Sequence, residues 1–220
     1  MSIEDNLNSI NEILGKSTKL VAISKTKTWQ QIMECYNLGQ KVFGENKVQE
    51  LVEKHNVLPI DIEWHLVGHL QRNKVKYLAP FVTLIHSVDS LDLLKEINKQ
   101  GIKCNRIINC LLQIYIAKEE TKFGLNEEEA LALLLDNDFK ALKNVHLLGV
   151  MGMATNTNDR AQIRGEFRSL KRFSDKLIKE FSSEQHPFLE VSMGMSHDYE
   201  MAIEEGSTLV RVGSRIFGER

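Results

Sequence analysis

Leu20-Val-Ala-Ile-Ser-Lys-Thr-Lys27 is a short apolar run that passes directly into a polar Ser-Lys-Thr-Lys segment. A run of this length, rich in branched apolar residues, predicts a buried strand of a parallel sheet. An open, doubly wound sheet usually carries a glycine-rich turn after its first strand, and the residues directly after Ile23 contain no glycine. The segment therefore favours a closed barrel, with the open sheet as the alternative.

Outward from this strand, short apolar runs alternate with longer amphipathic segments along the chain. Parallel strands need crossover connections, which are usually helices, so this alternation predicts parallel β-structure. Eight such runs in 220 residues predict a single (β/α)8 TIM barrel, and we expect residues 1–220 to form one domain because no linker-like stretch interrupts them. The expected strands are 20–24, 41–44, 62–67, 82–87, 107–116, 145–151, 188–192 and 208–212, and the expected helices are 4–14, 29–38, 47–54, 73–78, 91–99, 127–136, 159–181 and 198–204.

The bulk composition bounds the possible partners. Hydrophobic residues make up 42% and charged residues 26%, with a formal net charge of -2, so no basic excess would attract nucleic acid or an anionic membrane. The amino-terminal residues show neither region of a signal peptide, and no apolar run is long enough to span a bilayer. Cys35, Cys104 and Cys110 form no C-x-x-C pair, so neither a disulfide framework nor a metal site is expected. We therefore expect a cytoplasmic protein.

The carboxyl ends of the strands are where a TIM barrel builds its active site. Lys25 follows the first strand and is expected near the barrel mouth, with apolar residues beneath it. A lysine desolvated in such a place can supply a neutral amine that forms a Schiff base with an aldehyde. A surface lysine just past a strand is the competing interpretation, since lysines are mostly exposed.

The loops after the seventh and eighth strands have the composition of a phosphate site. They supply Gly194, Ser196, Gly213 and Ser214. Glycines let backbone N–H groups approach a phosphate, hydroxyls add donors, and a helix beginning at Ser214 would direct its positive end at the anion. Ordinary strand-to-helix turns with serine caps remain the alternative.

Arg211 lies within the eighth strand segment. A guanidinium stays protonated, so an inward-facing copy needs a ligand or a carboxylate as partner. The pyridine nitrogen of pyridoxal 5′-phosphate (PLP) is one candidate, because PLP proteins pair that nitrogen with an Asp or an Arg. A buried glutamate is the other.

Seven ordered motifs carry a resemblance to one family, from about Leu20 to the carboxyl terminus. The chain closely resembles the PLP homeostasis proteins, also called proline synthase co-transcribed proteins, whose fold is similar to the amino-terminal barrel of alanine racemase, PLP fold type III. The motifs are Ala22-Ile-Ser-Lys-Thr-Lys27, Phe43-Gly-Glu-Asn-Lys-Val-Gln-Glu50, Trp64-His-Leu-Val-Gly-His-Leu-Gln71, Asn73-Lys74, His86-Ser-Val-Asp89, Ser192-Met-Gly-Met-Ser196 and Val210-Arg-Val-Gly-Ser-Arg-Ile-Phe-Gly218.

The resemblance implies a set of cofactor-binding residues and a function in intracellular vitamin B6 homeostasis, without an established catalytic activity. PLP-dependent apoenzymes are the partners this implies, and Lys74 or Lys122 is considered as a second lysine that briefly holds PLP. The implied residues are Lys25 for the Schiff base, Ser192, Ser196, Gly213 and Ser214 for the phosphate, and Asn46, His65, Met193 and Arg211 for the ring.

Two enzymatic alternatives stay open at this point. An amino-acid racemase needs a proton acceptor on each face of the substrate, and Lys25 can serve only one. The expected end at Arg220 leaves no room for the second domain of fold-type III racemases, which also favours a monomer over the racemase dimer. A phosphorylated-sugar enzyme with a Schiff-base lysine would use the same phosphate loops.

Overall fold

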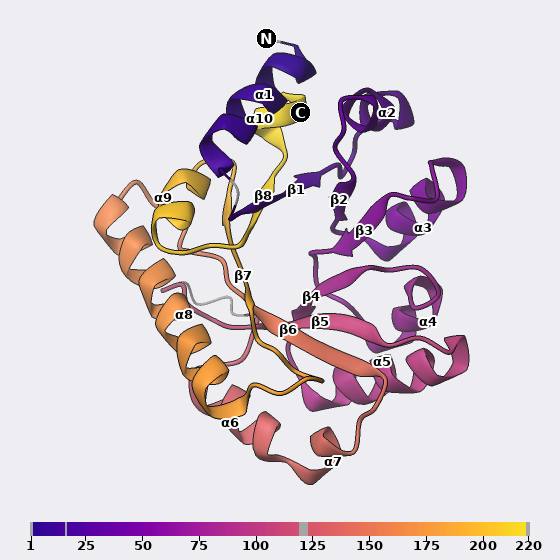
Figure 1. The fold of residues 1–220 in the computed structure, drawn as a ribbon, viewed down its shortest axis with the longest axis vertical. Coiled ribbons are helices and arrows are strands. Elements are labelled where there is room, and N and C mark those ends of the chain that lie inside the picture. Colours follow the sequence, from indigo (N-terminus) through magenta and orange to yellow (C-terminus); the bar gives the residue numbers. More distant parts are fainter. Residues whose placement is uncertain (1, 16, 119–122, 219–220) are drawn as a thin grey trace.

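The computed structural model describes residues 2–15, 17–118 and 123–218. Within them, eight parallel strands close into a barrel in chain order, and β1 pairs with both β2 and β8 (Figure 1). The (β/α)8 architecture predicted from the alternating runs is therefore confirmed. The strands are β1 (Lys19–Ile23), β2 (Val42–Glu45), β3 (Glu63–Leu66), β4 (Leu84–Val88), β5 (Ile108–Gln113), β6 (Val145–Met151), β7 (Glu190–Met195) and β8 (Leu209–Val212).

Helices surround the barrel on its outside (Figure 1). Several begin at capping side chains, as the sequence favours: Thr28 and Asn126 each form a capping box with the residue three positions later. The predicted helix 73–78 divides into a 3-10 turn and a single α-turn. The helices are α1 (Ile3–Leu14), α2 (Trp29–Asn37), α3 (Val48–Val57), η1 (Arg72–Lys74), α4 (Val75–Leu78), α5 (Leu91–Cys104), α6 (Glu127–Leu135), α7 (Asn137–Lys140), α8 (Arg160–Phe181), α9 (Tyr199–Glu204) and α10 (Ser214–Phe217).

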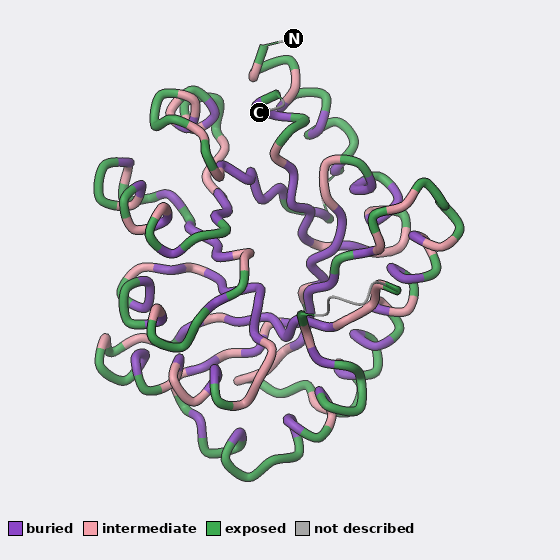
Figure 2. Tube along the Cα trace, turned by 180° about the vertical axis from the view of Figure 1, so that it is seen from behind, coloured by how far each residue is buried: buried purple, intermediate pink, exposed green. Residues whose placement is uncertain are grey.

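Apolar side chains pack in two separate layers, because successive residues of a strand point to opposite faces. One layer lies between strands and helices and contains large side chains such as Trp64 and Phe167. The other fills the interior of the barrel. Figure 2 shows the strands as a mostly buried ring inside partly exposed helices. The buried residues of the interior layer are Val21, Ile23, Leu84, Leu111, Met151 and Leu209.

The first and last helices lie side by side, so the two ends of the described chain meet (Figures 1 and 2). Asn6 Nδ2 of α1 donates a hydrogen bond to the carbonyl oxygen of Ile216 in α10, at 3.0 Å. α1 also contacts β1, and its buried residues are Leu7, Ile10 and Leu14. This contact between α1 and α10 helps to hold α10 in place just after the end of β8.

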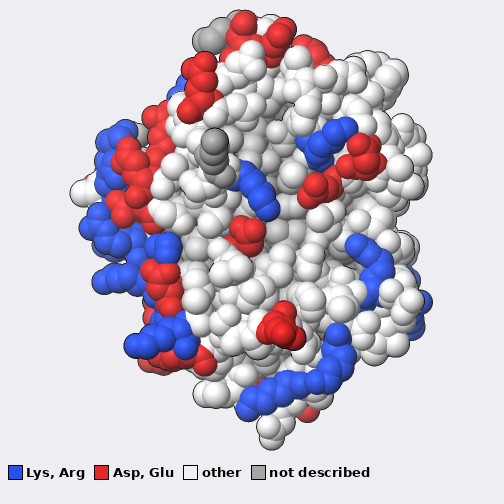
Figure 3. Space-filling model, viewed as in Figure 1, with Lys and Arg blue, Asp and Glu red and all other residues white. Residues whose placement is uncertain are grey.

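Charged side chains of both signs are intermixed on the surface over α8 and α9, at the left of Figure 3. Arg164 and Arg168 of α8 form ion pairs there with Glu204 and Glu205 at the end of α9. No helix in the described part of the chain is long and apolar enough to cross a membrane.

Candidate functional site

A cavity of about 410 Å³ opens at the carboxyl ends of the strands, where the sequence analysis placed the site. Its lining residues lie at or just after the ends of β1, β2, β3, β6, β7 and β8. Six of the nine residues predicted to contact a cofactor line it: Lys25, Asn46, Ser196, Arg211, Gly213 and Ser214. The remaining lining residues are Ile23, Thr26, Lys27, Val67, Met153, Met195, His197 and Gly218.

Lys25 occupies the second position of a tight turn that leaves the end of β1. The N–H of Lys27 donates to the carbonyl oxygen of Ser24 at 3.0 Å, which closes the turn. Thr26, at the third position, has a φ of 63°, a left-handed conformation that this turn geometry usually reserves for glycine. Lys25 is half-buried, with Ile23 beneath it in the barrel interior. The turn thus directs a lysine over an apolar floor, as the sequence predicted.

Arg211 is 4% exposed and points into the barrel from β8. Its Nη1 donates to Ser192 Oγ at 2.6 Å and its Nη2 to the carbonyl oxygen of Gly152 at 3.0 Å. Burial lowers the pKa of Arg211 to about 10, so the guanidinium remains charged at neutral pH. Both hydrogen bonds join the guanidinium to neutral oxygens rather than to the buried glutamate that the sequence left as an alternative. A buried cation held by neutral groups is well suited to receive an acceptor from a ligand.

Two histidines continue the buried hydrogen bonds of Arg211 and Ser192 into the barrel. We call Arg211, Ser192, His86 and His65 the polar layer. His86 Nδ1 lies 2.9 Å from Ser192 Oγ, and His86 Nε2 lies 3.0 Å from His65 Nδ1. Burial lowers the pKa of His65 to about 3 and that of His86 well below its ordinary value, and the charge of Arg211 lowers the pKa of His86 further. Both imidazoles are therefore neutral at pH 7.

The donor of each hydrogen bond in this row from Arg211 to His65 can be assigned, because Arg211 can only donate. Because Arg211 donates to Ser192 Oγ, the serine hydroxyl is free to donate to His86 Nδ1. His86 then carries its proton on Nε2 and donates to His65 Nδ1. Every hydrogen bond points away from Arg211, so the chain fixes the orientation of the guanidinium.

The loops after β7 and β8 meet at the cavity wall. The N–H of Gly213 donates to Ser196 Oγ at 3.1 Å, and α10 begins at Ser214, as the sequence predicted. Gly194 has a φ of 94°, and a Cβ there would lie 2.5 Å from Ala202 Cβ of α9. Only glycine fits this close approach, so the β7 loop can bend back over α9 and present Ser196.

Three of the predicted contact residues lie outside the cavity lining. Ser192 and His65 point into the barrel below it, and their side chains are occupied by the hydrogen bonds to Arg211 and His86. Met193 points outward, because the alternation of β7 places its side chain in the layer between strands and helices. Their contacts with a cofactor stay a prediction.

The second lysine is also placed by the structure. Lys74 lies on η1 with its Nζ 5.8 Å from the centre of the Tyr77 ring, outside the cavity lining. Lys122 lies outside the described residues. The lysine that shares the cavity with Lys25 is Lys27, whose Nζ lies 3.3 Å from the carbonyl oxygen of Gly218.

His86 and Gly152, for which no role was predicted, complete the hydrogen-bonded support of Arg211. His86 could have been found, because Leu84 points inward and the period of two places His86 on the same face. Gly152 acts through its backbone oxygen, for which its residue type gives no signal.

Comparisons with known proteins agree with this geometry. Residues 1–220 match the family model described as alanine racemase, N-terminal domain. A pyridoxal phosphate homeostasis protein of Aquifex aeolicus is 44% identical over 203 residues, which cover 92% of this chain and 87% of that protein. The human pyridoxal phosphate homeostasis protein is 37% identical over 212 residues, covering 92% of this chain and 76% of that one.

Solved structures give the same result. PipY of Synechococcus elongatus PCC7942, with PLP bound, has a TM-score of 0.88 at 32% identity, and the match covers 99% of this chain and 100% of PipY. An alanine racemase of Clostridium difficile 630 has a TM-score of 0.80 at 15% identity, covering 100% of this chain and 57% of the racemase. The second likeness is one of fold alone.

The closed parallel barrel is the fold of the alanine racemase N-terminal domain. Within that class, the chain belongs to the pyridoxal phosphate homeostasis protein family, which confirms the resemblance drawn from its motifs.

Proposed function

We propose that this protein binds PLP through Lys25 and holds it for intracellular vitamin B6 homeostasis. One observation carries the proposal: the Lys25 amine, the Arg211 guanidinium and the loop pair of Ser196 and Ser214 line a single cavity. Its volume of about 410 Å³ lies within the usual range for small-ligand sites. The donor set also fits PLP, which needs an amine for its aldehyde, donors for its phosphate and a partner for its ring nitrogen.

Each group of the cavity would serve one part of the cofactor. PLP supplies an aldehyde that condenses with a primary amine, releasing water and leaving oxidation states unchanged. Lys25 would provide that amine, and Ser196, Gly213 and Ser214 would hold the phosphate. Arg211 would face the ring nitrogen, and Asn46 would contact the ring from β2.

His65 and Ser192 would support this set from below the cavity, and the cofactor contacts predicted for them and for Met193 stay part of the proposal. The chain of neutral groups from Ser192 to His65 keeps Arg211 in one orientation and leaves its remaining N–H groups for a ligand. An arginine there would keep the ring nitrogen unprotonated and weaken the ring as an electron sink. This favours custody of the cofactor over catalysis.

In this function the protein is a non-catalytic, monomeric carrier in the cytoplasm that delivers PLP to apoenzymes. The names of the relatives, which are homeostasis proteins, support a carrier. Delivery is tested by mixing purified holoprotein with a PLP-dependent apoenzyme while a trap removes free PLP. Recovery of the apoenzyme's activity is expected, and no recovery in the presence of the trap would overturn direct delivery.

Binding itself is tested with purified protein and added PLP. We expect a yellow adduct that borohydride fixes on Lys25, and loss of that adduct in Lys25→Ala. Lys95→Ala is the control, because Lys95 forms an exposed ion pair with Asp138. A protein that stays colourless with PLP, or an unchanged adduct in Lys25→Ala, would reject the assignment.

Racemase activity is the second candidate, because the cavity also holds Lys27 and His197 as potential proton acceptors. Of the tyrosines, Tyr115 lines a smaller neighbouring cavity that shares Met153 and Met195 with the first. Deuterium exchange at Cα of amino acids distinguishes the two functions. We expect no sustained exchange, and exchange that disappears in Lys25→Ala would favour the racemase.

A further inference from the structure

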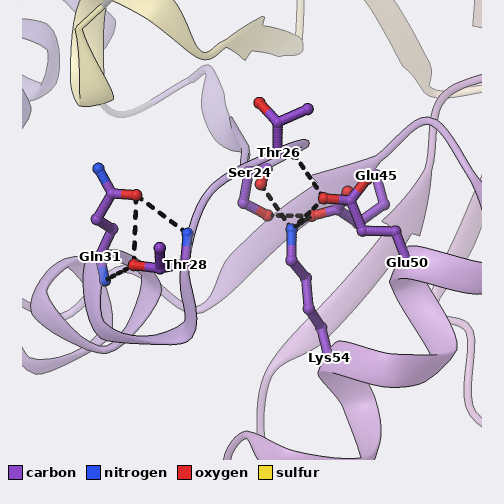
Figure 4. A network of polar contacts seen from close by, with 7 residues as sticks. All are labelled: Ser24, Thr26, Thr28, Gln31, Glu45, Glu50 and Lys54. Atoms are coloured by element: carbon purple, nitrogen blue, oxygen red, sulfur yellow. Dashed lines mark hydrogen bonds and ion pairs between the residues drawn. The ribbon is translucent and has the colours of Figure 1, made fainter. Parts of the chain in front are cut away.

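Lys54 is a buried lysine whose three ammonium hydrogens all have an acceptor. It lies on α3 and is 8% exposed. Its Nζ donates to the carbonyl oxygen of Ser24 at 2.7 Å, to Glu45 Oε1 at 2.7 Å and to Glu50 Oε1 at 2.8 Å. Figure 4 shows these groups converging on the lysine from β1, β2 and α3. We call Lys54, Ser24, Glu45 and Glu50 the Lys54 cluster.

The carboxylates of the cluster have unlike environments. Glu45 is fully buried, and burial raises its pKa although Lys54 and Ser24 oppose the shift. Its Oε2 is buried with no hydrogen-bond partner in the described part of the chain. Burial also acts to raise the pKa of Glu50, but hydrogen bonds from Lys54 and from the N–H of Thr26 outweigh it and lower that pKa.

The cluster holds the chain on both sides of Lys25. Before it, the carbonyl oxygen of Ser24 accepts from Lys54, and Ser24 Oγ donates to Glu45 Oε1 at 2.6 Å. After it, the N–H of Thr26 donates to Glu50 Oε1 at 2.5 Å. Glu50 and Lys54 are one helical turn apart, so a single face of α3 contacts both residues that flank Lys25.

The held segment is short and strained. Thr26, a β-branched residue, has a φ of 63°, an unfavourable conformation that persists only where the surroundings impose it. Two residues later, α2 begins with the Thr28–Gln31 capping box, also drawn in Figure 4. The backbone around Lys25 is therefore fixed from α3 on one side and from α2 on the other.

We propose that Lys54, with Glu45 and Glu50, is a positioning residue for Lys25: it holds the Ser24 carbonyl and, through Glu50, the Thr26 N–H, so that the Lys25 amine points into the cavity. This inference rests on the proposed binding of PLP by Lys25. It adds a set of residues behind the barrel wall, none of which lines the cavity.

A positioning role explains why a costly arrangement is present. Apolar residues of similar size often stabilise a fold as well as a buried ion pair does, so a gain in stability alone does not explain the cluster. Misplacement of a reacting group by about 1 Å can slow its reaction by roughly 100-fold. Holding Lys25 from both sides prevents such misplacement.

Three variants separate positioning from folding. The double variant Lys54→Met, Glu45→Gln removes both buried charges together, so neither is left unpaired. Glu50→Ala removes the acceptor of the Thr26 N–H, and Glu50→Gln restores a side-chain oxygen at that place. Lys95→Met is the matched control, since it also removes a lysine from an ion pair, at the surface.

Two ligands are compared for each variant. PLP reports the rate of adduct formation on Lys25, by absorbance and by peptide mapping after borohydride. Pyridoxine 5′-phosphate has an alcohol in place of the aldehyde, so it reports whether the cavity still binds. We expect the double variant and Glu50→Ala to form the adduct roughly tenfold to hundredfold more slowly. Both should bind the alcohol within about threefold of the unchanged protein, and Glu50→Gln should recover most of the rate.

Unchanged adduct rates in folded double and Glu50→Ala variants would overturn the inference. An equal loss of affinity for the alcohol would also overturn it, because the cluster would then maintain the cavity as a whole. The unchanged protein is the reference: absence of any adduct there rejects the proposed function itself, whereas a normal adduct with insensitive variants rejects only the role of Lys54.

Discussion

At the scale of single residues, the polar layer in the barrel depends on one serine. Ser192 is the only described side chain that joins the cation of Arg211 to the neutral His86. Its hydroxyl can accept a hydrogen bond from Arg211 and at the same time donate one to His86. This double function explains why a fully buried polar side chain lies at this point of β7.

Ser192→Ala should destabilise the protein. It removes an acceptor from Arg211 and a donor from His86, both buried, so the free energy of unfolding should fall by about 1–3 kcal/mol. Urea denaturation measures the change. Ser174→Ala is the control, because Ser174 is equally buried but its hydroxyl has no partner in the described part of the chain. Ser174→Ala should be neutral or stabilising, and equal effects of the two substitutions would contradict this account.

Residue types predicted the visible part of the site better than its support. Arg211 was predicted because it is a charged residue within an apolar strand pattern, and Lys25 because it directly follows such a run and stands in a motif of the resembled family. Ser192 and Met193 could not be told apart by type, because only the inward or outward direction of the strand separates them. The Lys54 cluster was missed, since Glu45 and Lys54 are nine residues apart on different elements and resemble surface residues in sequence.

At the scale of elements, β6 and β7 approach each other unusually closely at Gly149. Gly149 pairs with Glu190, and a Cβ on Gly149 would lie 2.8 Å from Glu190 N and closer still to its carbonyl group. These atoms of Glu190 belong to the backbone and cannot rotate away as a side chain could. The start of β7, and with it the strand that carries Ser192, thus depends on the missing side chain.

Gly149→Ala should therefore lower the free energy of unfolding by about 1–3 kcal/mol or more, because the strands must separate. The matched control is Gly165→Ala on α8, where a Cβ meets nothing within 4 Å. There, alanine should stabilise the exposed helix by roughly 0.5–1 kcal/mol. Thermal melting of the two variants checks the opposite signs, and a shift of the same sign in both would contradict the packing argument.

Element boundaries were predictable where apolar pattern and caps agree, as for β6, which spans the expected 145–151. The predicted boundaries were wrong where the backbone conformation of a residue, and not its hydrophobicity, sets the end of a strand. β7 was expected from Phe188, but that residue has a φ of 53°, so the strand begins only at Glu190. The apolar side chain is buried, and its burial imitates a strand residue in the sequence.

At the scale of the whole molecule, barrel closure was predictable because eight strands alternating with helices favour a closed barrel over an open sheet. Closure also brings His65, His86 and Arg211, which are far apart in sequence, into one enclosed polar layer. Protonating a histidine of that layer costs free energy, and the layer is held by several strands together. This cost should appear in the stability of the entire fold.

Acid should therefore destabilise the protein before its carboxylates are protonated. The pKa of His65 is lowered from 6.5 to about 3 in the fold, and that of His86 is lowered in the same direction. The unfolded chain binds these protons first as pH falls below about 6.5, so stability that is fully present above this pH is lost progressively below it. Each buried histidine should remove about 1.4 kcal/mol per pH unit.

Urea titrations of the cofactor-free protein between about pH 7.5 and pH 5 measure this loss, in a window above the ordinary range of most carboxylates. His186, with its pKa lowered to about 4, acts in the same direction, whereas Glu45, with its raised pKa, opposes them. The double variant His65→Leu, His86→Leu isolates the interior pair, because the other groups remain. Its stability should depend less steeply on pH, and a slope equal to that of the unchanged protein would mean that the polar layer inside the barrel takes up no protons on unfolding.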